Sequence, residues 1–243
     1  MNKKFFLLLV IFALFFSSCG FPVRYTTVRG SGNIISESRR VADFNSVDLS
    51  GIGMLIIEQG DKESLEISAE ENLLPYLRSE VSGNNLKLGV QEFVNIQPTE
   101  DIIYRLTVKD LNTIETSGLG NVEIDSLETN RLFIEISGSG KVSIDDLRVE
   151  SVTLEISGLG DINLAGKVSD QRVKLSGAGS YQAGNLESSS ASVEISGTGN
   201  AVVWAIDTLT IELSGAGKVE YYGSPVLNSD ISGVGQLKSL GEK

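Results

Sequence analysis

Six carboxylates recur at one position of a repeated motif and are the clearest candidates for binding chemistry. Each lies two residues before a Ser-Gly-x-Gly tetrapeptide, and in the fourth of seven copies the equivalent residue is Lys174. Stacked carboxylates supply the oxygen ligands that divalent cations prefer, or a surface for a cationic partner. The alternative is a solvated strand face whose charges oppose edge pairing. The six acids are Glu115, Glu135, Glu155, Glu194, Glu212 and Asp230.

Cys19, the single cysteine of the chain, is a candidate for lipid attachment. It follows two lysines, twelve apolar residues from Phe5 to Phe16 and two serines, which is the pattern of a secretory signal ending at a small-residue cleavage site. We predict a lipoprotein signal peptide over residues 1–19, with cleavage before Cys19 and acyl chains on it that anchor the protein to a membrane. Phe16 departs from the leucine that is usual at its position, and an ordinary signal peptide that ends in Cys is the alternative.

The composition excludes several kinds of active site. The 243-residue chain contains no histidine and one cysteine, so it forms no His-based triad, imidazole metal site, intrachain disulfide, zinc cluster or iron–sulfur centre. The repeated serines have no histidine to activate them and are interpreted as hydrogen-bonding turn residues. The formal charge of −12 argues against a nucleic-acid surface, which needs basic residues. We expect no enzymatic activity, no catalytic residue, no cofactor and no resident metal.

A few aromatic residues offer a separate possibility for binding. Tyr181, Trp204, Tyr221, Tyr222 and Phe133 lie in the repeat region, where exposed rings stack on sugars or seed an oligomer. Partial burial under neighbouring turns is the competing interpretation. The sequence alone leaves these two interpretations open.

The motif recurs at a nearly constant interval along the second half of the chain. Its copies begin at Ser117, Ser137, Ser157, Ser176, Ser196, Ser214 and Ser232, and an eighth copy, Ser50-Gly51-Ile52-Gly53, stands alone far upstream. Alternating apolar and polar residues, as in Leu132 to Ile136, precede each copy and indicate a strand with one buried face. We predict that the paired glycines occupy turn positions requiring positive φ. They are Gly118, Gly120, Gly138, Gly140, Gly158, Gly160, Gly177, Gly179, Gly197, Gly199, Gly215, Gly217, Gly233 and Gly235.

The repeat length predicts how the strands are arranged. One repeat spans roughly 60–65 Å of extended chain, enough for one lap around an aliphatic core. Successive laps then pair as parallel strands, which predicts an all-β, single-stranded parallel β-helix (β-solenoid) of about seven regular 18–20-residue coils with an irregular N-terminal β part or cap. An antiparallel meander or a propeller is the alternative, although a propeller blade of about 40 residues would need two repeats.

The chain before the repeats is organised differently. We predict a flexible tether over residues 20–38, rich in Gly, Ser and Thr, followed by one solenoid domain over residues 39–243. Within it, residues 39–116 are irregular and act partly as a cap, and residues 117–235 are the regular repeats. A separate small β domain is the alternative for the irregular part.

Local patterns predict the elements of this irregular part. Short strands are expected around Val47 to Leu49, Met54 to Glu58 and Ile102 to Val108. Asn72 is placed to cap a short helix over Leu73 to Val81, because a side-chain amide at this position accepts from the first helical N–H groups.

The sequence also resembles a known family, the putative auto-transporter adhesin, head GIN domain. The resemblance covers about residues 38–235 and implies a β-helical envelope domain, common on lipoproteins of Gram-negative bacteria, with no assigned catalytic residues. It is carried by the Ser-Gly-x-Gly repeats and by Arg40-Val41-Ala42-Asp43-Phe44-Asn45-Ser46-Val47, Glu71-Asn72-Leu73-Leu74, Gly83-Asn84-Asn85-Leu86 and Tyr222-Gly223-Ser224-Pro225.

These observations predict a non-catalytic, lipid-anchored protein of the cell envelope, adhesin-like, with a surface for an unknown protein or glycan ligand. Gly20 to Arg24 contains no acidic run of the kind that directs some lipoproteins to the cell surface, which favours an outer-membrane lipoprotein facing the periplasm. A self-associating structural scaffold, and hence a homo-oligomer, is the alternative. A carbohydrate-active β-helix enzyme is a third, but Asp145-Asp146 and Lys218 lie in unrelated repeats.

Overall fold

The computed structural model describes residues 25–243, so the predicted signal peptide and Cys19 lie outside the described residues. No helix in the described part is long and apolar enough to cross a membrane. The first half of that part holds one short 3₁₀ helix, η1 (Leu74–Tyr76), and ten short strands. They are β1 (Thr26–Arg29), β2 (Ile34–Arg39), β3 (Ser46–Leu49), β4 (Met54–Gln59), β5 (Ser64–Glu70), β6 (Leu77–Ser82), β7 (Asn85–Val90), β8 (Val94–Gln97), β9 (Ile103–Val108) and β10 (Thr113–Thr116).

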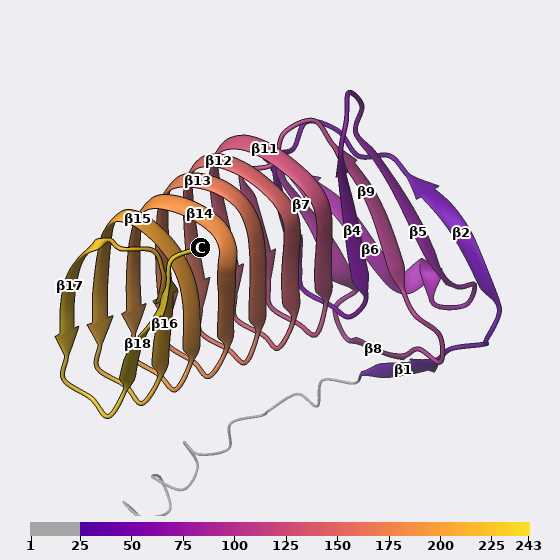
Figure 1. The fold of residues 1–243 in the computed structure, drawn as a ribbon. Helices are drawn as coiled ribbons and strands as arrows, with labels where there is room; N and C mark the ends of the chain where they lie inside the picture. The colour runs from indigo at the N-terminus through magenta and orange to yellow at the C-terminus, as the bar shows by residue number, and fades with distance from the viewer. Residues whose placement is uncertain (1–24) are drawn as a thin grey trace, which may run out of the picture.

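The second half is a β-solenoid of about six turns over residues 113–241, and the fold prediction is confirmed. Its laps lie side by side like ribs along a rod (Figure 1). The seven Ser-Gly-x-Gly motifs bound six laps rather than seven. The strands are β11 (Asn121–Ile136), β12 (Lys141–Ile156), β13 (Asp161–Leu175), β14 (Ser180–Ile195), β15 (Asn200–Leu213), β16 (Lys218–Tyr222), β17 (Val226–Ile231) and β18 (Gln236–Gly241).

Two sheets enclose the core, and each long strand bends from one into the other. The start of β11, at Asn121–Ile124, pairs with β4, whereas its end, at Phe133–Ile136, pairs with β10. We call the first sheet the ladder sheet. It consists of β6, β7, β3, β10, the C-terminal halves of β11–β15, and β17. The second sheet consists of β2, β5, β9, β4, the N-terminal halves of β11–β15, β16 and β18. The two sheets meet at the Ser-Gly-x-Gly turns on one side and at the bends on the other.

The isolated eighth motif joins the other seven in space. Ser50-Gly51-Ile52-Gly53 connects β3 to β4, and the backbone N–H of Leu119 donates to the carbonyl of Gly51 (3.0 Å). Strands β3 and β4 therefore form a first lap that stacks directly on β10 and β11. After β4 the chain leaves this lap, builds the N-terminal end of both sheets, and returns at β10.

Inward-facing aliphatic side chains fill the space between the sheets. Alternation along each long strand buries one residue in two, as in Leu132, Ile134 and Ile136. These positions repeat from lap to lap, so that Ile134 lies between Ile114 and Leu154 on the neighbouring strands. Burial of a large aliphatic side chain contributes roughly 1.5–3 kcal/mol, and every lap repeats the contribution.

The prediction of positive φ at the repeat glycines is wrong. None of the fourteen has positive φ, and among the eight motifs only Gly53 does, at +129°. These positions require glycine because the backbones of successive laps approach each other closely there. A Cβ on the first glycine of each repeat would collide with the carbonyl oxygen of the corresponding glycine one lap earlier, as for Gly138 against Gly118. The sharp turns stack so closely that no side chain fits between them.

Differences in lap length are absorbed at the bends. The lap that is one residue short shifts register between Ile144 and Leu147, opposite Gly166, whose φ is +122°. The 18-residue lap that contains β15 is shorter still. The register of β15 against β14 shifts between Gln182 and Glu187 and again after Ser188. The turns and the ladder sheet therefore keep a constant register although the repeats vary in length.

Residues 25–38 of the predicted tether form strands instead. Strand β2 pairs antiparallel with β5, and β1 pairs parallel with β8. The composition, rich in Gly and Ser, predicts flexibility. The segment is instead held to β5, where the Glu70 carboxylate accepts a hydrogen bond from the backbone N–H of Gly32 (2.6 Å). This ordered pairing cannot be recognised without the partner strand.

The predicted helix over residues 73–81 is also wrong. Only η1 forms, and β6 follows it directly. Leu77 and Val81 face the core side of an antiparallel hairpin with β7, and the charged Arg78 and Glu80 between them are exposed, which is the period-two pattern of a strand. Asn72 does not cap η1; its side chain donates to the carbonyl of Arg29 (2.7 Å) and accepts from the N–H of Ser31 (3.0 Å).

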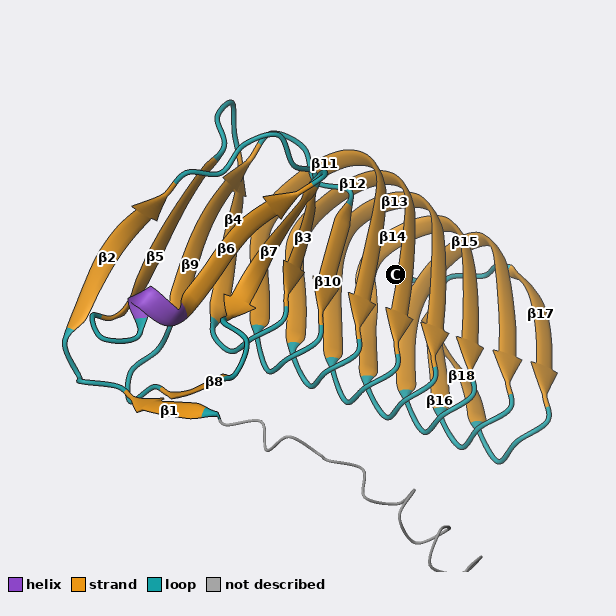
Figure 2. Ribbon diagram, turned by 180° about the vertical axis from the view of Figure 1, so that it is seen from behind, coloured by secondary structure: helices purple, strands orange, loops and turns teal. Residues whose placement is uncertain are grey.

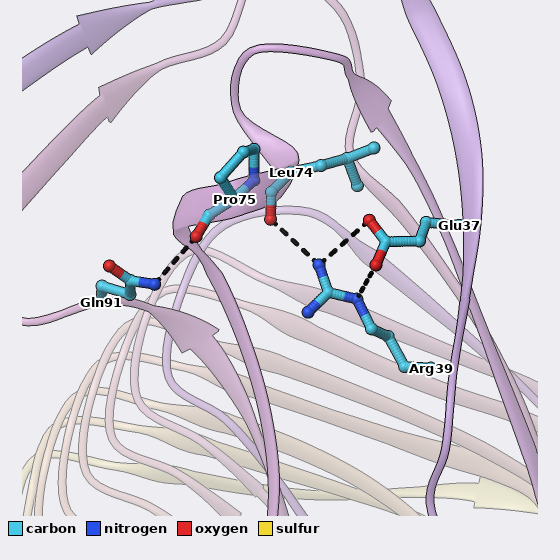
Figure 3. A network of polar contacts seen from close by, with 5 residues as sticks. All are labelled: Glu37, Arg39, Leu74, Pro75 and Gln91. Carbon is cyan, nitrogen blue, oxygen red and sulfur yellow. Dashed lines mark hydrogen bonds and ion pairs between the residues drawn. The ribbon is translucent and has the colours of Figure 1, made fainter.

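Polar contacts fasten η1 to its neighbours. Arg39 of β2 donates through Nη2 to the carbonyl of Leu74 (3.1 Å) and pairs with Glu37, with 2.9 Å between Nε and Oε1 (Figure 3). Gln91 donates to the carbonyl of Pro75 (2.8 Å). These hydrogen bonds link η1 to β2 of the second sheet and to the residue that follows β7 of the ladder sheet. Figure 2 shows η1 at the N-terminal end of the rod.

Candidate functional site

The structure places the six predicted acids in one column on the outer face of the ladder sheet. Neighbours in the column are direct partners across adjacent parallel strands, as Glu135 is with Glu155 and Glu212 with Asp230. Lys174 occupies the fourth position, between Glu155 and Glu194. We call this column the acidic ladder: Glu115, Glu135, Glu155, Lys174, Glu194, Glu212 and Asp230.

The column continues beyond the residues that the repeat identified. Asp48 on β3 is the partner of Glu115, and Lys87 on β7 is the partner of Asp48. Asp48 lies two residues before Ser50, so the rule that found the ladder identifies it as well. Lys87 precedes no Ser-Gly-x-Gly motif, and nothing local in the sequence indicates its position.

Burial and neighbouring like charges shift the pKa values of the first two acids in the column, Asp48 and Glu115. Asp48 and Glu115 are half-buried, and their burial raises the pKa of both carboxyl groups. Asp48 and Glu135 on either side raise the pKa of Glu115 further, whereas Lys87 opposes both shifts. The ladder therefore carries electrostatic strain at this end, which Lys87 partly relieves.

A second column, of mostly hydroxyl side chains, runs beside the ladder. It lies two residues earlier on each strand and contains Thr113, Phe133, Thr153, Arg172, Ser192, Thr210 and Asn228. Because Ser192 is small, the surface is hollowed beside Arg172 and Lys174, in two adjoining depressions of about 330 and 360 Å³. We call the two columns together the ladder face.

The ladder does not resemble a metal site. No group of three or more potential ligands among residues 25–243 is arranged to hold a metal ion. Lys174 interrupts the column and pairs loosely with Glu194, at 3.9 Å between Nζ and Oε1. Adjacent carboxylates project from a flat sheet rather than converging on one point, so the face is suited to a ligand that extends across several laps.

The repeated serines act through their backbone. The N–H of Ser137 donates to the carbonyl of Thr116 (2.9 Å), and the equivalent bond recurs at every motif. Within residues 25–243, the side-chain hydrogen bond of a motif serine is the one that Ser50 donates to the carbonyl of Leu88 (3.2 Å), which is not a general base, and all these serines are exposed. The geometry assigns them to turn formation, not nucleophilic chemistry.

The aromatic residues are divided between core and surface. Tyr181 is fully buried and donates to Gln171 (3.0 Å) inside the solenoid. Trp204 and Tyr222 are half-buried near the C-terminus, where Lys243 lies over both rings, with Nζ 5.4 and 4.8 Å from their centres. Phe133 alone projects from the ladder face and is half-buried. The rings therefore form no continuous stacking platform for sugars.

A rod with short turns, in-register polar columns and an aliphatic interior defines the class of protein: a β-solenoid that presents a repetitive surface. Within this class, the chain belongs to the family described as "Putative auto-transporter adhesin, head GIN domain", whose pattern it matches over residues 43–225. No curated protein matches the chain.

Solved structures share the architecture. A protein described as a putative adhesin from Bacteroides fragilis is 27% identical, with a TM-score of 0.84 over 88% of this chain and all of that one. A protein described as a putative lipid binding protein from Parabacteroides distasonis is 23% identical, with a TM-score of 0.75 over 88% and all of the two chains. A putative adhesin from Parabacteroides merdae is 20% identical, with a TM-score of 0.70 over 88% and 99%. The last two likenesses concern the fold alone.

Proposed function

We propose that this chain is a non-catalytic, lipid-anchored adhesin of the cell envelope whose ladder face binds an extended protein or glycan. The observation that carries the proposal is the constant register of the ladder sheet, which repeats the same two side-chain positions on every lap. Membership of an adhesin family and the similarity to the B. fragilis protein support it.

Repetition makes a weak contact useful. Strands in a sheet lie about 4.7–4.9 Å apart, so an extended ligand lying along the rod meets a new pair of side chains from the two columns at that interval. In four of the seven pairs these are a carboxylate and a hydroxyl. Each contact is solvent-exposed and individually worth little. Several engaged on one chain act at high effective concentration, which raises the overall affinity without any deep pocket.

The chemistry of the face favours a basic, extended polypeptide over a neutral glycan. Its carboxylates attract Lys and Arg, and Arg172 and Lys174 set a register by repelling them at one place. A neutral sugar chain would need exposed rings to stack on, and Phe133 is the single ring of the two columns. The binding experiment described next therefore includes glycans as well as peptides.

Binding to arrays of peptides and glycans tests this function. The ladder variant carries Glu155→Gln, Glu194→Gln and Glu212→Gln, which keeps the shape of the face but removes three charges. The matched control carries Glu123→Gln, Glu128→Gln and Glu150→Gln, three exposed carboxylates outside the two columns. We expect basic peptides to be bound by the wild type and the control and lost by the ladder variant.

The outcomes separate the candidate partners. Loss of binding that is equal in the two variants would mean that net charge alone is responsible and would refute a role for the ladder. Retention of a glycan by wild type and control, with loss from the ladder variant, would assign the face to glycans. Binding to basic peptides should weaken as salt rises, because exposed ion pairs are screened beyond about 10 Å at 0.1 M.

The membrane attachment is proposed from the sequence pattern around Cys19. We expect Cys19→Ala to abolish incorporation of labelled palmitate and to release the protein from the membrane fraction. Protease treatment of intact cells then tests the outer-membrane, periplasm-facing location: protection in whole cells, with digestion after permeabilisation, is the expected result. Digestion of intact cells would place the ladder face at the cell surface instead.

A further inference from the structure

The C-terminal end of the solenoid has the shape of a step. β16 and β17 lie on one lap, and β18, which pairs with β16, begins the next lap. The second sheet therefore reaches one strand further than the ladder sheet at this end, which is opposite the N-terminal strands (Figure 1). In the described part of the chain, the outer edges of β17 and β18 have no strand partner. Edges of this kind are templates for another strand.

The step leaves part of the core uncovered. Leu227 and Ile231 continue the core columns of Leu209 and Leu213, which are fully buried, yet each is 40% exposed. Val234, the middle residue of the last turn, is 84% exposed. A partner that supplies the missing strand of the ladder sheet would cover these apolar groups.

The backbone groups that are free at this end belong to alternate residues. The N–H groups of Ser232 and Gln236, which flank the last turn, both donate to carbonyls of the preceding lap (3.0 Å). In a parallel ladder alternate residues bond to the same neighbour. The odd-numbered residues of β17, and those of β18 up to Ser239, therefore direct their N–H and C=O groups away from the rod. A partner strand has to match these positions.

We infer that the stepped end binds a second copy of this chain, with β17 of each copy pairing antiparallel with β18 of the other. The two-fold axis is parallel to the strands and passes through the last turn. Rotation about it places the projecting β18 of one copy on the shorter ladder sheet of the other, so each step is filled by the partner's β18. The inner faces stay inside and the two cores join, in an interface that uses the same surface of both copies.

One register satisfies the turns and the core together. It pairs residues that are equally distant from Val234, so Gly233 lies opposite the partner's Gly235. Glycine opposite glycine preserves the close backbone approach that the stacked turns require. In the adjoining strands Ile231 lies opposite the partner's Leu237, within the joined core. Both belong to the odd-numbered residues whose backbone groups are free.

The same register brings opposite charges together on the outer faces. Asp230, the last acid of the ladder, lies opposite the partner's Lys238, and the dimer contains this pair twice. Asp230 is exposed and belongs to no ion pair among residues 25–243, whereas Lys238 lies 3.6 Å (Nζ to Oε1) from Glu220. Opposite charges directly across strands stabilise a pairing. A shift of two residues would set Asp230 opposite Gln236 or Leu240 and lose both pairs.

The end of the chain leaves the step accessible. Beyond β18, Lys243 turns back along the rod and donates to the carbonyl of Gly184 and the side chain of Asn185 on β14. It also lies over the rings of Trp204 and Tyr222, on the preceding laps. The last residues therefore do not occupy the place that the partner's β18 takes.

The dimer is closed, because the other end of the rod does not accept a strand. Its edge strands β2 and β6 carry ion pairs, Glu37 with Arg39 and Arg78 with Glu80, and charged side chains on an edge oppose strand addition. Pairing therefore stops at two copies. Since the rotation exchanges the two sheets, the acidic ladders of the copies lie on opposite faces of one longer rod. The inference is independent of the proposed ligand.

A disulfide trap tests both the partner and the register. The full-length chain, produced with its own leader in a Gram-negative host, carries Cys19→Ser so that introduced cysteines are its only thiols. The test variant combines Asp230→Cys with Lys238→Cys, which lie on opposite outer faces of one copy and cannot bridge within it. In the dimer they face each other, and antiparallel pairs bring Cα atoms to about 4.5–5.5 Å, within the roughly 4.4–6.8 Å of a disulfide. The matched control combines Glu212→Cys with Glu220→Cys, on the same two faces one strand further from the step.

The yields of covalent dimer on mild oxidation decide between the outcomes. We expect the test variant to give at least about tenfold more than the control or than either single cysteine, because only its thiols face each other. Equal, low yields from the test variant and the control would refute the dimer. A strong dimer from Asp230→Cys alone would refute the register, and an adduct of another size would refute the second copy as the partner.

Sedimentation supplies a readout without cysteine. The Cys19→Ser chain should sediment as a dimer that dissociates on dilution. Asp230→Lys sets two lysines opposite each other at both junctions and should weaken the dimer about tenfold. Glu150→Lys, an exposed site away from the step, makes the same change of charge and should sediment like the parent. Matching melting temperatures of the two variants at dilutions where both are monomeric would show that both are folded.

Two results would overturn the inference. One is a parent chain that stays monomeric up to millimolar concentration. The other is equal weakening by Asp230→Lys and Glu150→Lys, which would mean that the total charge, and not the pair at the step, controls association.

Discussion

The carbonyl oxygen of Gly118 lies well inside van der Waals contact of the position that a Cβ atom on Gly138 would occupy. The same relationship links the first glycine of each later motif to its predecessor. The stacked turns are thus held at a separation that backbone atoms alone permit. The periodic glycine is therefore a packing requirement of the rod.

This contact predicts the effect of adding one methyl group. Gly138→Ala should lower the free energy of unfolding by about 1–3 kcal/mol, because the neighbouring atom is backbone and the turn must move. Ser139→Ala, at the exposed position between the two glycines, should stay within about 0.5 kcal/mol of wild type. Urea denaturation of both variants measures the difference, and equal stabilities would contradict the packing explanation.

The repeat was sufficient to predict the solenoid but not its first lap. Period-two alternation and a motif that recurs once per lap encode the coil locally, so β11–β15 follow from the sequence. Strands β3 and β4 belong to the same rod although the whole of residues 54–116 separates their turn from the next motif. That closure depends on tertiary pairing, which leaves no local pattern.

The ladder shows the same division between local and tertiary signals. Counting back from each motif finds the six acids, and Asp48 by the same rule. Lys87 reaches the column through the hairpin of β6 and β7, whose register depends on packing against β3. Glu70 likewise has no signal, since its neighbours Ala69 and Glu71 do not reveal that its carboxylate is buried.

Like charges at the start of the ladder predict a variant with increased stability. The pKa of Glu115 is raised by burial and by Asp48 and Glu135, so its ionised form opposes folding at neutral pH. Glu115→Gln should therefore stabilise the protein at pH 7, by about 0.2–1 kcal/mol for relief of like-charge pairs across strands.

The pH dependence of this gain has a definite sign. A raised folded-state pKa means that the penalty exists above that pKa and disappears as pH falls toward the unfolded-state value. The difference between Glu115→Gln and wild type should accordingly shrink near pH 4.5, the ordinary carboxyl value. Denaturation curves at pH 7.5 and 4.5 measure it, and a gain that grows on acidification would contradict the assignment.

Glu70 predicts the opposite sign. The hydroxyl of Thr99 (2.6 Å), its backbone N–H (2.9 Å) and that of Gly32 donate to this carboxylate and lower its pKa. Its stabilisation is present above the unfolded-state pKa and lost as pH falls through the folded-state pKa. Glu70→Gln should lower the melting temperature at pH 7, and this deficit should narrow below about pH 4.3, where the unfolded carboxyl is protonated.

Hydrogen exchange localises that effect. Because Glu70 bonds the segment before β2, faster exchange in Glu70→Gln should be confined to β1 and β2 and should spare β12–β14. Glu66→Gln, an exposed acid on the same strand, is the matched control and should leave exchange unchanged. Uniform acceleration across the solenoid would refute the local role.

Two buried tyrosines predict opposite outcomes for the same substitution. Tyr181 donates to Gln171 Oε1, and Gln171 donates in turn to Ser188 (2.7 Å), so the hydroxyl completes a buried network. Tyr181→Phe leaves the Gln171 oxygen unsatisfied and should cost about 1–3 kcal/mol. Tyr104 is equally buried, yet its hydroxyl has no hydrogen-bond partner within the described residues.

Tyr104→Phe should therefore be neutral or stabilising, because it removes a desolvated polar group without orphaning another. Both substitutions delete one oxygen from a fully buried ring, so volume and hydrophobicity are matched and the hydrogen-bonding difference is isolated. Urea denaturation at pH 7 gives the two free-energy changes directly. Similar destabilisation by both would mean that the Tyr104 hydroxyl is satisfied in solution and that its burial carries no penalty.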